Sequence, residues 1–207
     1  MGGKLGTLFA RAGHDVVFSY SRSVKKLERL ALEAGDNARH GTPAEAAADA
    51  DIVLIAVHWN RMDDVLRQAG GLPGRIVVTC SLPMNDADTE LVVGHTSSGA
   101  EELAKKVPDA AVVAALGSVP SEVLFAVFNA RDTEPPPHLL YCGDDEEAKA
   151  SVAELIRDAG FEPVDVGPLR SARYIEPFTM LVAKVAYEGD GGPAVVYRFE
   201  WREEAEA

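Results

Sequence analysis

The chain has 207 residues, 47% apolar and 26% charged, and a formal net charge of −13. Such a composition is typical of a globular protein with one sizeable core, and the negative charge argues against nucleic acid as a partner, because phosphate binding favours a basic surface. No apolar run approaches the roughly 20 residues that cross a bilayer, and no secretory signal precedes the first predicted helix, so we expect a cytoplasmic protein without a membrane partner.

The first segments predict part of a dinucleotide-binding unit. Residues 2–12 have apolar residues at helical spacing, Gly13 ends the helix, and residues 16–18 form an apolar strand. In such a unit, a first strand and a glycine-rich turn come before this helix, and the third glycine begins it. Gly2 can be that third glycine. We therefore expect the fold to lack its first strand, and Met1 to be an internal methionine of a longer natural protein.

Further along the chain, apolar and helical segments alternate, as in a mostly parallel sheet with crossover helices. Helices are predicted over residues 23–35, 43–49, 61–69, 98–107, 145–159 and 171–187, and strands over 36–41, 51–57, 75–80, 111–116, 139–142 and 162–166. The segment 119–128 is left unassigned, and Pro177 must lie early in the last helix or kink it. The acidic tail, 203–207, is expected to fray.

Ser21 and Arg22, which follow the strand 16–18, carry the clearest ligand signal. An acidic side chain here would bind the ribose 2′-hydroxyl of NAD, whereas serine and arginine suit the 2′-phosphate of NADP. Lys25 and Lys26 could add positive charge from the next helix. The alternative is a solvated helix start, although cations gain nothing from the helix dipole at an N-terminus. The residues therefore predict NADP(H) as the cofactor.

His58, Trp59 and the segment 79–83 follow two neighbouring buried strands. Ligands of open α/β sheets bind beyond the carboxyl ends of the strands, so Val57, His58, Trp59 and Pro83 are candidate cofactor contacts, together with Gly2, Ser21, Arg22 and Lys26. His58 could instead be a surface residue or act chemically. Trp59 could cover the core or stack against a ring.

Other polar residues give weaker signals. Ser97 and Ser98 have no paired base in the sequence, so a nucleophilic role is not expected, and Glu176 is expected to serve a helix start rather than proton transfer. Cys80 and Cys142 are isolated, and we expect reduced, buried thiols rather than a disulfide or a metal site.

Taken in order, these segments resemble the NADP oxidoreductases that depend on the deazaflavin coenzyme F-420 (also written F420). The resemblance extends from Met1 to about residue 200. It rests on Gly13-His14-Asp15-Val16, Ser21-Arg22, the run from Ala50 to Val57, Cys142-Gly143-Asp144-Asp145, and Gly167-Pro168-Leu169 with Ala172-Arg173.

The resemblance implies hydride transfer between NADP(H) and a deazaflavin or another small redox acceptor. It implies that Ser21, Arg22 and Lys26 hold the 2′-phosphate, that the segment 57–59 borders the nicotinamide, and that the C-terminal helices form a homodimer. Hydride transfer between stacked rings needs no proton carrier, so no catalytic side chain is named. The chain departs from the family pattern at two further places, and the second of them belongs to the region that helps hold the second substrate. His58 replaces a usual proline, and the segment 116–118 lies where relatives tend to carry Asn or His followed by Thr.

We therefore predict an α/β fold, with a doubly wound, mostly parallel Rossmann-like sheet that lacks its first strand. Residues 1–130 would form the NADP-binding domain, incomplete at its N-terminus, and residues 131–207 a smaller α/β portion that completes the sheet and ends in the dimer helix. The alternatives are a non-catalytic NADP(H)-binding module and an inactive truncated fragment. Hydroxyacid dehydrogenases and imine reductases need a large helical domain, and fewer than forty residues follow Leu169.

The absent strand would be central, between the strand that ends near Tyr20 and the one that ends at Val57. Its absence would leave a gap of roughly 9 to 10 Å. Unpaired backbone groups on both flanking strands would each cost on the order of 1–3 kcal/mol. Since domains are stable by only about 5–15 kcal/mol, we expect a chain extended upstream to be more stable and to bind NADPH better.

Overall fold

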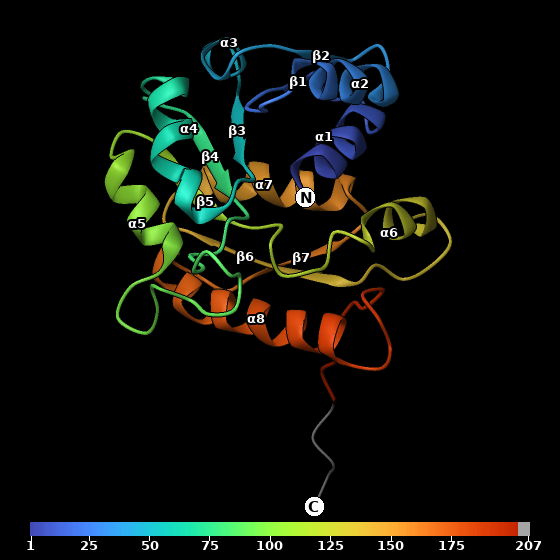
Figure 1. Ribbon diagram of the computed structural model, residues 1–207. Coiled ribbons are helices and arrows are strands. Elements are labelled where there is room, and N and C mark those ends of the chain that lie inside the picture. Colours follow the sequence, from blue (N-terminus) through green and yellow to red (C-terminus); the bar gives the residue numbers. More distant parts are fainter. Residues whose placement is uncertain (203–207) are drawn as a thin grey trace, which may run out of the picture.

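The computed structural model describes residues 1–202, and the acidic tail 203–207, for which fraying was expected, lies outside them. Apart from α6, which lies mostly in the segment left unassigned, the helices occur close to where the sequence predicts them (Figure 1). Their bounds are α1 (Gly2–Arg11), α2 (Val24–Ala34), α3 (Pro43–Ala48), α4 (Met62–Ala69), α5 (Gly99–Lys106), α6 (Leu124–Ala130), α7 (Glu146–Asp158) and α8 (Ala172–Glu188), with 3₁₀ turns at Trp59–Arg61 and Leu169–Ser171.

The strands form two sheets. They are β1 (Val16–Phe18), β2 (Ala38–His40), β3 (Ile52–Ile55), β4 (Ile76–Thr79), β5 (Ala111–Ala114), β6 (His138–Gly143) and β7 (Glu162–Asp165). One sheet pairs β1 with β2, and the other has the order β3-β4-β5-β6-β7. All neighbours are parallel except β5 and β6, so the predicted mostly parallel α/β sheet is confirmed.

The register aligns the carboxyl ends of the central strands. Ile55 at the end of β3 pairs with Thr79 at the end of β4, and Thr79 pairs with Ala114 at the end of β5. The loops that follow these three strands therefore begin at one edge of the sheet, where open α/β folds bind their ligands.

The division between the two sheets lies where the sequence predicts a gap. β1 and β3 belong to different sheets, and within residues 1–202 no strand pairs with both of them. The two sheets are connected through α1 instead. A Cβ at Gly6 would lie 2.4 Å from the ring of Phe18 in β1, and a Cβ at Gly2 would lie 3.0 Å from the Cβ of Ala56, just past β3. Small residues on α1 thus allow close contact with both sheets.

Helices cover both faces of the five-stranded sheet, because its apolar residues alternate between two cores. Val78 and Val113 point into one core with α1, α6 and α7, whereas Val77 and Val112 point into the other with α3, α4, α5 and the start of α8. Figure 1 shows α8 running below β6 and β7, with β1, β2 and α2 at the opposite end of the molecule. The doubly wound arrangement predicted from the sequence is confirmed.

Side-chain caps explain several helix boundaries. Ser23, Thr42, Ser98 and Asp145 each accept a hydrogen bond from a backbone N–H in the first turn of the helix that follows. Pro177 lies in the second turn of the 17-residue helix α8, in its early part as expected. Within the described residues, no helix combines the length and the apolarity that crossing a membrane requires.

Candidate functional site

A cavity of about 410 Å³ lies at the carboxyl ends of β3, β4 and β5. Its volume is within the range of small-molecule sites in proteins. Five parts of the chain that are distant in sequence line it. The lining residues are Met1, Ala56, Val57, His58, Trp59, Cys80, Ser81, Leu82, Met84, Asp88, Gly117, Ser118, Val119, Pro120, Ser121, Thr179, Val182, Ala183 and Tyr187.

The strand ends on one side of this cavity are held together by Ser81, which is buried. Its Oγ accepts a hydrogen bond from the Val57 N–H at 3.2 Å and donates to the Ile55 carbonyl at 3.4 Å. The loop after β5 also passes close to β4, since a Cβ at Gly117 would lie 3.1 Å from the Cys80 carbonyl oxygen. A larger residue at position 117 would therefore have to move backbone, which explains why glycine stands here.

His58 and Trp59 both line the cavity, as does Val57, which agrees with their prediction as ligand contacts. His58 is exposed, and its Nδ1 lies 3.7 Å from a carboxylate oxygen of Asp88. Trp59 is partly buried and begins the 3₁₀ turn before α4. Their contact with a cofactor, and a chemical role for His58, stay predictions.

Sequence reasoning missed the wall that α8 contributes. Thr179, Val182, Ala183 and Tyr187 lie at positions i, i+3, i+4 and i+8, so they share one face of the helix, and all four line the cavity. The Tyr187 hydroxyl donates to Glu122 at 2.9 Å, which connects α8 to the loop after β5. Small and apolar residues at helical spacing were the available signal, but a core-facing helix shows the same pattern.

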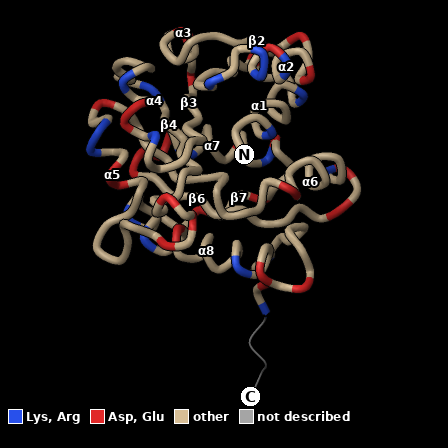
Figure 2. Tube along the Cα trace, in the orientation of Figure 1, with Lys and Arg blue, Asp and Glu red and all other residues tan. Residues whose placement is uncertain are grey.

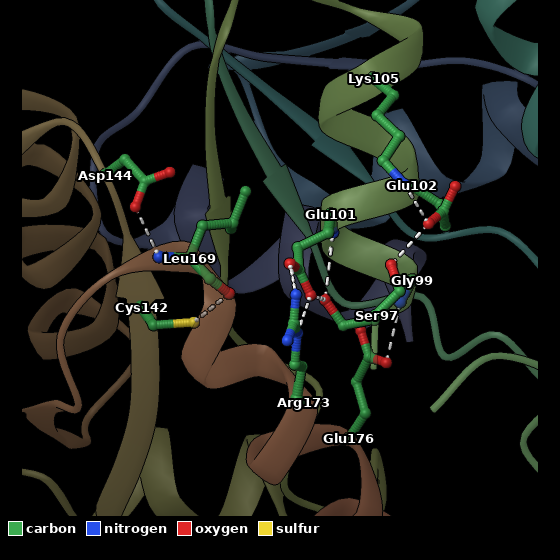
Figure 3. Close-up of polar contacts among 11 residues, drawn as sticks. Ser97, Gly99, Glu101, Glu102, Lys105, Cys142, Asp144, Leu169, Arg173 and Glu176 are labelled. Carbon is green, nitrogen blue, oxygen red and sulfur yellow. Dashed lines mark hydrogen bonds and ion pairs between the residues drawn. The ribbon is translucent and has the colours of Figure 1, made fainter. Parts of the chain in front are cut away.

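A polar network fixes α8 to α5 beside the cavity (Figure 3). The Glu176 carboxylate is 5% exposed and accepts from the N–H groups of Gly99 and Ala100 at 2.9 and 3.0 Å. Burial raises the pKa of Glu176 to about 7, although these two N–H groups act in the opposite direction. Arg173 donates to both oxygens of Glu101 at 2.6 and 2.8 Å. The prediction that Glu176 serves a helix start is confirmed.

The two cysteines are free thiols in the structure. Cys142 is buried and donates to the Leu169 carbonyl at 3.6 Å, while Cys80 is partly buried at the cavity. Burial raises the pKa of both thiols to about 12. Both therefore stay protonated near neutral pH and are poor nucleophiles.

The residues predicted to bind the phosphate lie apart from this cavity, at the carboxyl end of β1. Ser21 is partly buried and accepts from the Ser23 N–H at 3.2 Å. Arg22 and Lys26 are exposed, and in the described chain neither forms a salt bridge. Figure 2 shows basic residues among the acidic ones around α2 and β2.

The start of α1 lies between this basic loop and the cavity. Met1 lines the cavity and Gly2 approaches Ala56. The first turn of α1 has neither a side-chain cap nor an acidic residue, as is also true of α6 and α8, whereas α4, α5 and α7 carry acidic residues there. An uncapped helix start without acidic residues suits an anion. Pro83, another predicted contact, is buried against Gly99 of α5 and is not part of the cavity lining.

Comparison with known proteins finds a family match in the N-terminal part of the chain. A sequence model of the family described as "NADP oxidoreductase coenzyme F420-dependent" matches residues 1–83. The F420-dependent NADP reductase of Methanocaldococcus jannaschii is 30% identical over 203 residues, which covers 90% of this chain and 89% of the relative.

Two further relatives show how widely the fold is used. Metalloreductase STEAP3 of Rattus norvegicus is 34% identical over 132 residues, 64% of this chain, but the chain spans only 25% of that protein's length. A crystal structure of a candidate F420-dependent NADP-reductase from Arthrobacter sp. FB24 superposes with a TM-score of 0.83 over 97% of this chain and 95% of the other, at 21% identity. The latter similarity supports the fold predicted here.

Proposed function

Because this chain belongs to the family of F420-dependent NADP oxidoreductases, we propose that it transfers a hydride between NADP(H) and a small redox acceptor. The observation that carries this proposal is the position of the cavity. It lies beyond the carboxyl ends of three parallel strands, next to an α1 start that suits an anion. We further propose that residues 1–130 hold the cofactor, that residues 131–207 complete the sheet, and that the protein works in the cytoplasm.

Three groups of residues support NADP(H) as the cofactor. Arg22 and Lys26, with the Ser21 hydroxyl, would bind the 2′-phosphate, because guanidinium and ammonium groups pair with phosphate oxygens. The N–H groups at the start of α1 would face the diphosphate. Val57 and the residues after it would border the nicotinamide ring, which supplies or receives the hydride when the cofactor is bound.

The acceptor would enter from the α8 side of the same cavity. Val182 and Ala183 offer an apolar wall. The Thr179 hydroxyl already donates to the Ile175 carbonyl at 2.9 Å, so it does not need a hydrogen-bond acceptor from a ligand. Such a wall would orient a flat ring and exclude water from the transfer. A deazaflavin such as F420 is the first candidate, as the family description suggests.

The test is a spectroscopic assay of NADPH oxidation with oxidised deazaflavin F420, followed by flavins as alternative acceptors. We expect turnover with at least one of them. Ala183→Phe should fill the acceptor side and lower turnover at least ~10-fold while NADPH affinity changes little, because the bulky ring would displace the acceptor. The matched control is Lys184→Ala, whose side chain is exposed in a pair with Glu188.

Cofactor binding without turnover of any acceptor would instead support a non-catalytic NADP(H)-binding module. Failure to bind NADPH would contradict both functions.

We also propose a homodimer through α8. Tyr174, Leu181 and Val185 are 73%, 59% and 53% exposed, and their spacing of seven and four residues aligns them on one face of the helix. At 100° per residue, this face is opposite to the one that lines the cavity. A second copy packed against it would cover the stripe and stiffen the acceptor wall.

A further inference from the structure

Tyr20 has an unusual backbone conformation at the end of β1. It directly precedes Ser21 and Arg22, and its φ is +57°, in the left-handed region that favours glycine. Aromatic residues are rare in this region because of steric strain, and such strain persists only where surrounding contacts enforce it. A contact of the Tyr20 side chain is therefore expected to hold it in place.

That contact reaches across the division between the two sheets. The Tyr20 hydroxyl donates to Oδ2 of Asp64 at 2.7 Å, and Asp64 lies in the first turn of α4, the helix that follows β3. Asp64 also accepts from Gln68 at 2.9 Å and pairs with Arg67. The bond from Tyr20 lowers the pKa of Asp64, which keeps the carboxylate ionised as an acceptor. β1 and β3 are not paired with each other, so this side-chain bond joins the loop after β1 to the helix that follows β3.

Two details place Tyr20 at the adenosine end of the proposed cofactor site. In a doubly wound sheet, a dinucleotide lies across the crevice where the strand order reverses, and in this chain the division between the two sheets falls between β1 and β3. Tyr20 follows β1 and Asp64 lies in the helix that follows β3, and Tyr20 is next to the residues proposed to bind the 2′-phosphate. Tyr20 is only partly buried.

We propose that Tyr20 is the positioning residue of the adenosine end, and that its ring is the wall on which the adenine of NADP(H) stacks. The bond to Asp64 fixes the ring before the ligand arrives, so that less freedom is lost on binding. Purine rings stack well on aromatic side chains without needing a particular hydrogen-bond pattern. This inference rests on the proposed function, because it assigns a role within the same cofactor site.

The test uses the two halves of the cofactor as separate probes in calorimetric titrations of the full chain. The probe 2′,5′-ADP carries the adenosine end, and nicotinamide mononucleotide carries the other end. Tyr20→Ala should weaken 2′,5′-ADP binding about 10-fold, within the range for loss of one base–aromatic stack, and leave the mononucleotide unaffected. Tyr20→Phe keeps the ring but removes its hydrogen bond to Asp64, and it should weaken the binding of 2′,5′-ADP by only about 2- to 3-fold.

Asp64→Asn provides a second route if Tyr20→Ala fails to fold. This variant retains the ring of Tyr20 but weakens its hydrogen bond to position 64, so it should bind 2′,5′-ADP about as well as Tyr20→Phe does. Its matched control is Asp63→Asn, a neighbouring carboxylate that pairs with Lys106 instead and should bind 2′,5′-ADP as the unmodified chain does. Tyr20→Gly relieves the backbone strain without restoring a ring, and should bind as weakly as Tyr20→Ala.

The outcomes separate this inference from the proposed function. If the unmodified chain binds 2′,5′-ADP and Tyr20→Ala or Tyr20→Gly binds it equally well, the role of Tyr20 is wrong while the NADP(H) site stands. Tighter binding by Tyr20→Phe would also overturn the inference, because the bond to Asp64 would then close the crevice against the ligand. If the unmodified chain does not bind 2′,5′-ADP, the NADP(H) site and the role of Tyr20 are both wrong.

Discussion

Glu176 is a single buried carboxylate that joins two helices, although burying its ionised form costs free energy. Its two hydrogen bonds to α5 favour the ionised form, but burial dominates and raises its pKa to about 7, from an ordinary value of 4.5. A folded-state pKa above the unfolded value means that the protonated group stabilises the fold. This contribution is fully present below about pH 4.5 and is lost as the pH rises through about 7.

Glu176→Gln should therefore remove the part of the pH dependence of the unfolding free energy that Glu176 causes. The free energy of unfolding of the unmodified chain, relative to that of Glu176→Gln, should rise by on the order of 2–3 kcal/mol between pH 8 and pH 5. Urea denaturation of both proteins at the two pH values measures this difference. A difference that stays constant with pH would show that Glu176 is ionised throughout this range.

At the level of elements, the unpaired edges of β1 and β3 predict uneven local stability. β4 and β5 are each paired on both sides, whereas β1 is paired only with β2 in the described chain. We expect backbone amides of β1 and β2 to exchange at least ~100-fold faster than those of β4 and β5, since less-paired strands open at lower free energy. Hydrogen-exchange mass spectrometry of peptides covering residues 16–40 and 76–114 tests this. Uniform protection would mean that the two sheets unfold as one unit.

Much of this arrangement could be predicted from the sequence, because the signals were local. The apolar run 51–57 predicted β3. The bounds of α2 followed from Ser23 at its start and Gly35 at its end. α6 was not predicted, because six of its seven residues are apolar, so no alternation of apolar and polar positions marks a helical period in so short a segment. The cavity wall on α8 was missed because residues that line a hollow and residues that fill a core share the same spacing. The Tyr20–Asp64 bond joins residues 44 positions apart, which no local pattern shows.

At the level of the whole molecule, the exposed stripe on α8 predicts self-association. Leu181→Glu places a charge at the centre of the stripe and should convert a dimer into a monomer, because burying an unpaired carboxylate in an apolar interface is costly. Light scattering coupled to size-exclusion chromatography measures the mass. Lys184→Glu, on the same helix outside the stripe, is the matched control. A monomeric unmodified chain would contradict the proposed dimer.

The most direct test of the cofactor site is a comparison of NADPH and NADH binding, by titration of the unmodified chain and of Arg22→Leu. If Arg22 binds the 2′-phosphate, the unmodified chain should prefer NADPH, and Arg22→Leu should lose at least ~10-fold of that preference, mainly through weaker NADPH binding, because a charged hydrogen bond contributes roughly 1.5–3 kcal/mol. Binding of NADH should change little. A preference for NADH in the unmodified chain, or an unchanged ratio in Arg22→Leu, would contradict the assignment of this loop to the 2′-phosphate.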